Sequence, residues 1–242
     1  MNPRVSVLIP TFRRPHLLRR ALASLQRQTL DSWQAVVIDD GAGEGLAEAE
    51  SLRDPRIVAR ANQGKGQVDA RNTALGLAQG QAVALLDDDD WIEDPQHLTK
   101  ALNALAHRPA LVYRGGWLVR LEGQQELSRT AFNQVASPEK LRKDNLILAT
   151  GVVYPRAFHE QLGPFDPQMS DYWDWDWYLR VTGAGYPLHK LRGLGVMVAQ
   201  HGANMSYGAR VDERRANLAS LCAKHGLEGV ELKDHGSIAA AQ

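Results

Sequence analysis

The sequence predicts an α/β protein in which a mostly parallel central sheet carries helices on both faces. Through the first 110 residues, short apolar runs alternate with amphipathic segments, which is the pattern of repeated strand–helix units. Three of the apolar runs end in polar groups, at Pro10-Thr11, Asp39-Asp40 and Asp87 to Asp90. Because parallel strands finish at one edge of their sheet, these three groups are expected to share a crevice there.

Strands of the first half are expected where apolar residues run together, at 5–9, 35–38, 56–59 and 82–86. Helices are expected between and after them, at 15–28, 45–52, 65–78 and 95–106. The first helix begins with Pro15, whose fixed φ suits a first turn, and it places Leu18, Leu22 and Leu25 on one face. Each strand is thus followed by a helix that can cross over the sheet and return the chain in parallel.

The second half of the chain is less regular. Strands are expected at 110–113, 117–121, 150–154 and 194–199, with Arg114-Gly115-Gly116 separating the first two. A short helical or loop region is expected at 138–145, and helices are expected at 172–182 and 212–225. The segment after Gly226 is expected to be frayed or loosely packed. A smaller C-terminal region attached to the regular half is therefore predicted.

Composition limits the classes of function. Lys plus Arg and Asp plus Glu each number 28 among 242 residues, so the net charge is zero and no nucleic acid partner is expected. A single cysteine, Cys222, excludes an internal disulfide and a cysteine-based zinc site, and is typical of a reducing cytoplasm. The apolar run at 5–9 is too short for a signal peptide, and no window approaches the roughly 18 apolar residues of a membrane span. A cytoplasmic protein is expected, free or peripheral to a membrane, with its oligomeric state open.

Four aspartates, Asp87 to Asp90, follow directly on the apolar run 82–86. Packed carboxylates repel one another, and removing them from water is costly without a counter-charge, so the run favours a bound cation. Hard oxygen ligands suit Mg²⁺ or Mn²⁺, ions that usually also hold substrate phosphates. The alternative is a solvated acidic turn without any metal.

Five motifs, in order and at matching spacing over residues 4–207, resemble those of family 2 glycosyltransferases. They are Val5 to Arg14, Val37 to Gly41, Ala70 to Asn72, Leu86 to Asp90, and Gly163 to Asp166 leading into Trp173 to Asp176. The resemblance implies the GT-A fold, which has a Rossmann-like sheet and a smaller acceptor-side region. It also implies that residues 1–110 bind a nucleotide-sugar donor and that residues 111–242 form the acceptor-binding part of the same domain.

The resemblance assigns the donor pocket residue by residue. Pro10, Thr11 and Arg13 would line the base and ribose pocket, although Pro10 could simply end a strand. Asp39 would accept a hydrogen bond from the base; a carboxylate only accepts, which suits a uracil or thymine imide and favours a UDP or dTDP donor. The alternative for Asp39 is a turn-forming residue. Arg71 would contact the donor phosphates or neighbouring acids, and the alternative is a solvated helix arginine.

The acidic run resembles the Asp-x-Asp signature of the same family. By that resemblance, Asp89 would be the best metal ligand, Asp88 would reach the ribose hydroxyls, and Asp87 would support the site or bind the ion through water. Asp90 is expected to be a bystander. His201 would complete a coordination shell of carboxylates and phosphates; the alternative is an exposed or hydrogen-bonded histidine. A divalent cation, Mn²⁺ or Mg²⁺, is the expected cofactor.

A second carboxylate cluster lies at 173–177. Asp176 is expected to form a structural ion pair with Arg180 at spacing i, i+4. Asp174 would be the general base that deprotonates the acceptor hydroxyl, its carboxylate kept ionised by the helix N-terminus; the alternative is a favourable dipole interaction alone. The family usually has Glu-Asp here, and this chain has Trp instead of Glu. This exchange suggests an aromatic wall beside the acceptor, and the alternative is that the rings are simply buried in the core. The rings in question are those of Trp173, Trp175 and Trp177.

The resemblance implies an inverting glycosyltransferase that acts by a single in-line displacement. The acceptor would be a sugar, a lipid-linked molecule or another hydroxyl compound. A sugar-phosphate nucleotidyltransferase is one alternative, but it would need a glycine-rich loop after the first strand, where this chain has Pro10 to Arg14. A nucleotide-sugar-binding module without catalysis is the other alternative, because a fold does not fix a function.

Overall fold

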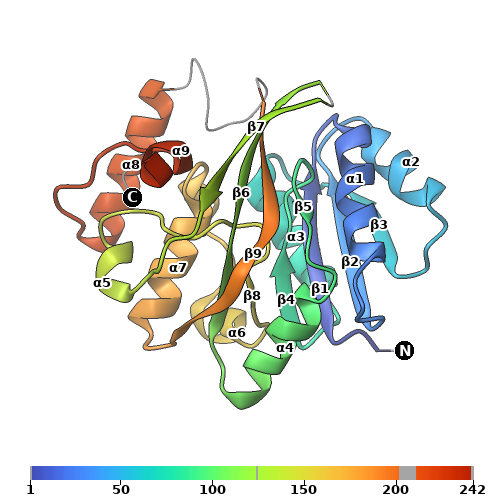
Figure 1. Cartoon of the computed structure of the whole chain (residues 1–242), viewed down its shortest axis with the longest axis horizontal. Helices are drawn as coiled ribbons and strands as arrows, with labels where there is room; N and C mark the ends of the chain where they lie inside the picture. Colours follow the sequence, from blue (N-terminus) through green and yellow to red (C-terminus); the bar gives the residue numbers. More distant parts are fainter. Residues whose placement is uncertain (1, 124, 202–210, 241–242) are drawn as a thin grey trace.

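The computed structural model describes residues 2–123, 125–201 and 211–240, and its strands form one curled sheet (Figure 1). Among these residues the sheet has nine strands in the order β3-β2-β1-β4-β8-β6-β9-β5, with β7 paired to β6. The fold is therefore of the predicted α/β class.

The first half contains the parallel part of the sheet. Its strands are β1 (Val5–Thr11), β2 (Trp33–Asp39), β3 (Ile57–Ala61) and β4 (Ala82–Leu85), with β1 central and parallel to β2 and β4. Every residue of β1, β2 and β4 is buried, which explains why these strands are continuous apolar runs and do not alternate. The associated helices are α1 (Pro15–Gln26), α2 (Glu44–Ser51), α3 (Gln67–Leu77) and α4 (His97–His107).

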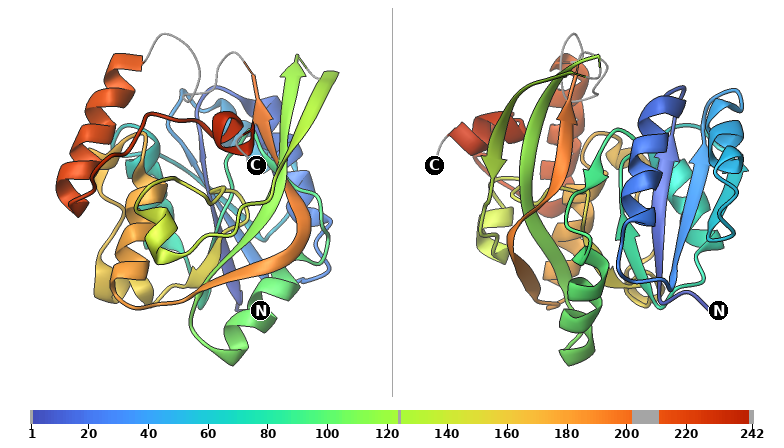
Figure 2. Two further views of the ribbon diagram at one scale, coloured as in Figure 1. Left: turned by 60° about the vertical axis from the view of Figure 1, so that its left-hand side comes forward. Right: turned by 45° about the vertical axis from the view of Figure 1, so that its right-hand side comes forward.

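Helices cover both faces of the parallel strands (Figure 2). On one face, Val7 and Ile9 of β1 belong to a core cluster with α1 and α4. On the other face, Leu8 belongs to the cluster that contains the buried residues of α3. Adjacent residues of β1 thus contact different helical layers, because successive side chains of a strand point to opposite faces.

The second half of the sheet is mixed rather than parallel. Strand β8 (Val153–Pro155) runs antiparallel to β4 and to β6 (Leu111–Glu122), which lies parallel to β9 (Leu188–Gln200). Two antiparallel strands that the sequence pattern did not predict complete it, β7 (Gln125–Phe132) beside β6 and β5 (Trp91–Ile92) beside β9. The predominantly parallel sheet expected from the strand–helix pattern therefore describes the first half.

The expected strands at 110–113 and 117–121 are one strand, β6, and the predicted break between them is wrong. The chain stays extended through Gly115 and Gly116 because β9 and the end of β7 both pass very close there. A Cβ atom at Gly116 would lie 2.5 Å from the carbonyl oxygen of Val196, and one at Gly115 would lie 2.9 Å from the oxygen of Phe132. These two glycines permit close strand contact and do not form a turn.

The remaining helices pack beside the mixed strands. They are α5 (Pro138–Leu141), α6 (Phe158–Leu162), the 3₁₀ turn η1 (Pro167–Met169), α7 (Trp173–Gly183), α8 (Val211–His225) and α9 (His235–Ala240). The segment after Gly226 was expected to be frayed, and this expectation is wrong, because Leu227, Ile238 and Ala239 are buried. The amide of Gln134 also donates to the carbonyl of Ile238 over 3.3 Å. The C-terminal segment is thus part of the core.

None of the helices that the structure describes has the length and hydropathy needed to cross a bilayer.

Candidate active site

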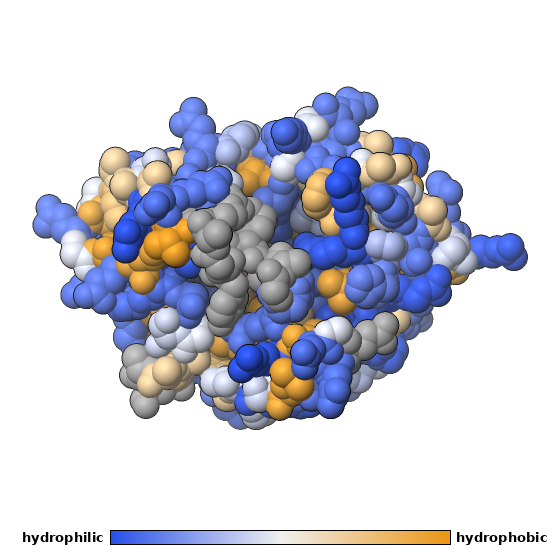
Figure 3. Space-filling model, turned by 90° about the horizontal axis from the view of Figure 1, so that it is seen from above, coloured by the Kyte–Doolittle hydropathy of each residue, from blue (hydrophilic) through white to orange (hydrophobic). Residues whose placement is uncertain are grey.

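The polar groups at the ends of β1, β2 and β4 surround one cavity of about 750 Å³. Figure 3 looks down on this side of the molecule, where hydrophilic side chains dominate and hydrophobic ones form small separate patches. Both halves of the chain contribute to the lining, through residues 10–14, 40, 65–67, 71, 87–90, 144–145, 148–150, 170–175, 198–199, 214, 231, 233–235 and 238. The structure thus brings together the three strand-end groups that the sequence pattern predicted to share a crevice.

Two aspartates of the acidic run are held by the loop after β1. Asp88 is buried; it accepts a hydrogen bond of 2.7 Å from the Thr11 hydroxyl and one of 2.6 Å from Arg14. The same guanidinium donates to Asp89 over 2.6 Å, and His201 Nε2 lies 3.2 Å from the same Asp89 oxygen. Asp89 and His201, both predicted as metal ligands, are therefore adjacent. Arg14 was part of the first motif but had no predicted role.

Asp90 was expected to be a bystander, and the structure contradicts this. Its side chain is buried, and its two oxygens accept separate hydrogen bonds, from the Thr150 hydroxyl over 2.5 Å and from the Ala199 backbone over 2.9 Å. Asp90 thus ties the acidic turn to β9 and to the loop before β8. No local sequence pattern predicts this role, because Thr150 and Ala199 lie far from Asp90 along the chain.

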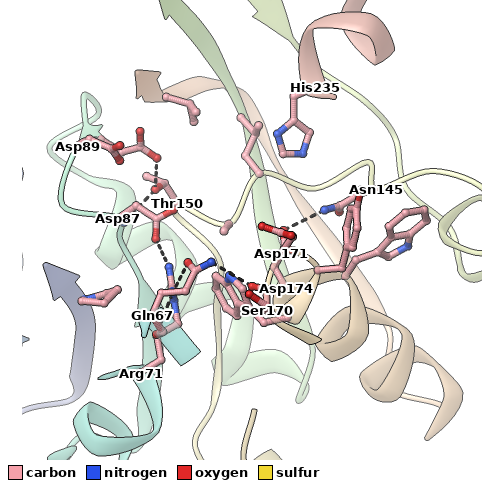
Figure 4. Close-up of a pocket in the computed structure, with 18 of the residues that line it drawn as sticks. Gln67, Arg71, Asp87, Asp89, Asn145, Thr150, Ser170, Asp171, Asp174 and His235 are labelled. Carbon is pink, nitrogen blue, oxygen red and sulfur yellow. Dashed lines mark hydrogen bonds and ion pairs between the residues drawn. The ribbon is translucent and has the colours of Figure 1, made fainter. Parts of the chain in front are cut away.

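Arg71 contacts a neighbouring acid, as the resemblance implied. It is buried rather than solvated, forms an ion pair with Asp87, and donates to Gln67 Oε1 over 2.9 Å. Its guanidinium lies 3.7 Å from the centre of the Trp173 ring (Figure 4 shows Gln67, Arg71 and Asp87). The aromatic residue found where the family has Glu therefore supports the arginine by a cation–π contact.

The acidic turn has the donor chemistry of a divalent cation site. One oxygen from each of Asp87, Asp89 and Asp90 can be chosen so that all three lie within 4.8 Å of one another. Burial, together with the neighbouring carboxylates, raises the pKa of Asp88 to about 7 and that of Asp90 well above its usual range. Burial acts in the same direction on Asp89, but His201 and Arg14 outweigh it and lower the pKa of that carboxyl. The charges are thus only partly balanced by the protein, and hard oxygen ligands in this arrangement fit Mg²⁺ or Mn²⁺.

The geometry does not support the base-binding role expected of Asp39. This residue is 2 % exposed and is absent from the cavity lining, whereas its neighbour Asp40 lines it. Both Asp39 oxygens accept backbone hydrogen bonds, from Gly41 over 2.7 Å and from Gly45 over 2.9 Å. Asp39 therefore holds the loop before α2 and satisfies amide groups at the start of that helix, which is the turn-forming alternative.

The loop after β1 contains a strained residue that lines the cavity. Arg13 has φ of 54°, in the left-handed region that non-glycine residues rarely adopt. Such a conformation costs on the order of 1 kcal/mol and is often found at functional sites. Pro10, Thr11 and Arg13 all line the cavity, so the three predicted donor-pocket residues lie together.

Asp174 lies in the first turn of α7 and lines the cavity. It is buried and accepts a hydrogen bond of 2.9 Å from Asn145 Nδ2. Burial raises the pKa of Asp174 to about 6, although hydrogen bonds from Asn145 and the Trp175 backbone act in the opposite direction. The helix N-terminus was expected to keep this carboxylate ionised; desolvation, which opposes ionisation, is the largest effect on its pKa. A pKa near 6 suits a general base that works near neutral pH.

The three tryptophans of α7 differ in position. Trp173 and Trp175 line the cavity, and Trp175 also donates from Nε1 to the Leu141 carbonyl over 2.6 Å. Trp177 is fully buried, stacks on His159 with ring centres 4.1 Å apart, and does not line the cavity. The expectation that Trp177 contacts the acceptor is therefore corrected, because this ring belongs to the core.

The structural ion pair predicted for Asp176 is confirmed. Its carboxylate accepts from Arg180 Nε over 2.9 Å. It also lies 2.7 Å from Lys224 Nζ and 2.7 Å from His225 Nε2, so that it links α7 to α8.

A comparison with family models matches residues 6–161 to glycosyl transferase family 2, which is more than half of the chain. The chain belongs to this family. It is therefore a glycosyltransferase, and the alternatives of a nucleotidyltransferase and of a non-catalytic binding module are set aside. An uncharacterized glycosyltransferase of Bacillus subtilis, YwdF, is 29 % identical over 238 residues, covering 96 % of this chain and 87 % of the relative.

Solved glycosyltransferase structures share the fold of this chain, which therefore has the expected GT-A architecture. TarS 1–349 of S. aureus in complex with UDP gives a TM-score of 0.67 at 18 % identity, covering 97 % of this chain and 68 % of that one. The mannosyltransferase PcManGT of Pyrobaculum calidifontis, in complex with GDP-Man and Mn²⁺, gives a TM-score of 0.66 at 18 % identity, covering 100 % of this chain and 69 % of the other.

Proposed function

We propose that this glycosyltransferase transfers a sugar from a nucleoside diphosphate donor, UDP or dTDP, to an acceptor hydroxyl with inversion. The observation that carries the proposal is that the aspartate cluster and the buried Asp174 line one cavity. A leaving group and a base must act on opposite sides of the anomeric carbon, and a cavity of about 750 Å³ is within the size range of ligand pockets. Because Asp39 does not line the cavity, the choice of nucleotide is supported by the UDP complex of TarS, which favours UDP.

The loop after β1 and the acidic turn bind the donor in this proposal. Pro10, Thr11 and Arg13 line the base and ribose, and Asp88, which Thr11 holds in place, accepts from the ribose. Arg71 stabilises the departing diphosphate from its fixed position on Trp173. Residues 1–110 are thus the donor part of the domain, and residues 111–242 the acceptor part.

Asp89, with His201 beside it, is the proposed protein ligand of a divalent cation, and Asp87 supports the site. A divalent ion supplies Lewis-acid stabilisation of the charge that develops on a departing diphosphate. The Mn²⁺ complex of PcManGT supports the presence of such an ion. A cytoplasmic location, expected from the single cysteine, stays a prediction.

Asp174 is the proposed general base. Its carboxylate removes the proton of the acceptor hydroxyl as that oxygen attacks the anomeric carbon. Asn145 orients the carboxylate by donating to one of its oxygens. Transfer by one displacement inverts the anomeric configuration and needs no second nucleophile.

A thermal-shift screen of nucleotide sugars, with and without Mn²⁺, tests the donor and the metal. Ligand binding to the folded state raises the melting temperature, so a UDP- or dTDP-sugar should give a shift that depends on Mn²⁺ and is lost in Asp89→Ala. GDP-mannose is the matched comparison for the base. A Mn²⁺-dependent shift that Asp89→Ala leaves undiminished would remove Asp89 from the metal site, and a shift with GDP-mannose alone would refute the uridine or thymidine preference.

A further inference from the structure

Three buried side-chain atoms of residues that line the cavity have no hydrogen-bond partner among the described residues, and one of them is the hydroxyl of Tyr172. The other two are Oδ1 of Asn145 and Nε2 of His235. In Figure 4 the two side chains face the same part of the cavity, one from the loop after α5 and the other from the C-terminal segment. A buried polar atom without a partner costs about 1–3 kcal/mol, so Asn145 Oδ1 and His235 Nε2, which face one part of the cavity, point to a ligand that supplies a partner to each.

The chemistry of the missing partner follows from the contacts that these residues already make. Asn145 donates through Nδ2 to Asp174, whose carboxylate only accepts, so Oδ1 of Asn145 is fixed as an acceptor that needs a donor. Burial lowers the pKa of His235 to about 4, which leaves its imidazole neutral near pH 7. A neutral imidazole offers one donor and one acceptor, and a hydroxyl group can serve either.

His235 is also held in place by packing. Its ring meets Phe132 of β7 edge to face, with ring centres 5.0 Å apart. Ile238, one turn later in α9, is buried and is tied to Gln134 through its carbonyl. The imidazole is therefore presented to the cavity by a fixed segment of the core.

The charges around these two atoms disfavour an anionic ligand. Five carboxylates line this end, contributed by Asp144, Asp171, Asp174, Glu231 and Asp234. Two cationic side chains line it, and Lys233 is engaged by Asp144 at 2.9 Å and by Glu231 at 3.7 Å. Arg214 donates to the backbone oxygen of Lys233 over 3.1 Å. Like charges at short range raise the free energy of a bound anion, so a carboxylate or phosphate on the ligand would be rejected here.

We propose that the acceptor is an uncharged sugar, with one hydroxyl donating to Asn145 Oδ1 and another paired with His235 Nε2. This inference rests on the proposed function, because it names the acceptor class of the same site. It gives the C-terminal segment a role in acceptor recognition. A uronic acid or a phosphorylated sugar is excluded from the position next to Asp174.

A matched pair of glycosides tests whether the site rejects a negatively charged acceptor. Methyl glucoside and methyl glucuronide differ only in the group at C6, and corresponding uncharged glycosides of galactose and N-acetylglucosamine complete the panel. Binding is followed by saturation-transfer NMR on the protein with UDP and diamagnetic Mg²⁺ present. At least one uncharged glycoside should bind at millimolar concentration, with its uronate counterpart at least about tenfold weaker. Equal or tighter binding of the uronate overturns the proposal, as does the failure of every uncharged glycoside to bind.

Variants of His235 test whether its imidazole contacts the acceptor. His235→Phe keeps a ring against Phe132 but removes both nitrogens, so glycoside affinity should fall about tenfold, the loss of one buried hydrogen bond. His235→Gln keeps a nitrogen donor and should retain more affinity than His235→Phe. The same exchange on the exposed end of α4, His107→Phe, is the control and should change nothing. Glycoside affinity within twofold of the wild type in His235→Phe would overturn the proposal.

The donor site provides an internal check on these variants. Each should keep the thermal shift with UDP and Mn²⁺, which shows that the fold and the donor part are intact. If the wild type itself lacks that shift, the proposed function fails. If the shift is present and glycoside binding disagrees with the expectation, only the acceptor inference fails.

Discussion

Replacing Asp174 by Asn should strongly slow transfer and at the same time stabilise the protein. The amide has the shape of the carboxylate, and its oxygen can still accept from Asn145 Nδ2, which donates to Asp174 over 2.9 Å. The exchange therefore removes one negative charge from a buried position and keeps the hydrogen bond from Asn145. Loss of function with gain of stability would identify a group that is kept for chemistry at a cost to the fold.

The size of the stability gain follows from the pKa. A pKa of about 6, against the ordinary 3.8 of an aspartate, corresponds to about 3 kcal/mol. The folded protein keeps a proton on Asp174 that the unfolded chain has already released, so stability falls as pH rises from about 4 to about 6. The full penalty is present at pH 7. Asp174→Asn should thus be more stable by up to about 3 kcal/mol at pH 7, and this difference should shrink toward zero near pH 4.

The change in rate should be much larger than the change in stability. A general base contributes about 100- to 10,000-fold, so release of nucleoside diphosphate in the presence of acceptor should fall by that factor. In the wild type the rate should rise with pH through about 6, as the carboxylate with its raised pKa ionises. Transfer within tenfold of the wild type would refute the base assignment. A less stable variant in urea denaturation at pH 7 would refute the desolvation argument.

Asp176→Asn is the matched control, two residues further along the same helix. Burial works to raise the pKa of Asp176, but His225, Lys224 and Arg180 outweigh it and lower that pKa. Removing this charge leaves its partners unpaired and should cost about 3–5 kcal/mol, the opposite sign from Asp174→Asn. The rate per folded molecule should be retained, since Asp176 does not line the cavity.

Three further changes test separate parts of the structure. Asp39→Ala removes the acceptor of the Gly41 and Gly45 amides and should lower the unfolding free energy in urea by about 1–3 kcal/mol; an unchanged midpoint would contradict the loop-holding role. Gly116→Ala places a Cβ 2.5 Å from the oxygen of Val196 and should cost about 1–3 kcal/mol or more by calorimetry, whereas a neutral result would mean that β9 can move aside. Arg14→Ala removes the cation that pairs with Asp88 and Asp89; it should lower the metal-free melting temperature and tighten Mn²⁺ binding measured by electron paramagnetic resonance, and weaker Mn²⁺ binding would contradict this.

The sequence patterns predicted the parts of the fold whose side chains are buried on both faces. Strands β1, β2 and β4 are such parts, so each is a continuous apolar run. Strand β7 was missed because all but one of its residues are exposed, and no apolar period marks it. The C-terminal segment was missed for a related reason. Its buried residues Leu227 and Ile238 are too far apart in the chain to form a periodic pattern.

The candidate site was predictable where its residues follow strand ends in sequence, as at Pro10 and Asp89. Residues that reach the site from elsewhere were not predictable in the same way. Asn145 and His235 come from an irregular loop and from a segment without a pattern, and only the folded chain brings them near Asp174. The pKa of Asp174 likewise depends on burial, which a helix position alone does not reveal.

The pairing of β4 with β8 determines how far this enzyme can be divided into parts. All four residues of β4 are buried, and the strand is bonded to β1 on one side and to β8, from beyond residue 150, on the other. A fragment ending at residue 110 would expose that apolar edge with its amides and carbonyls unpaired, which is a template for aggregation. The donor half is therefore not an independently folding module. New specificities are better engineered by grafting loops around the cavity than by joining halves of different enzymes.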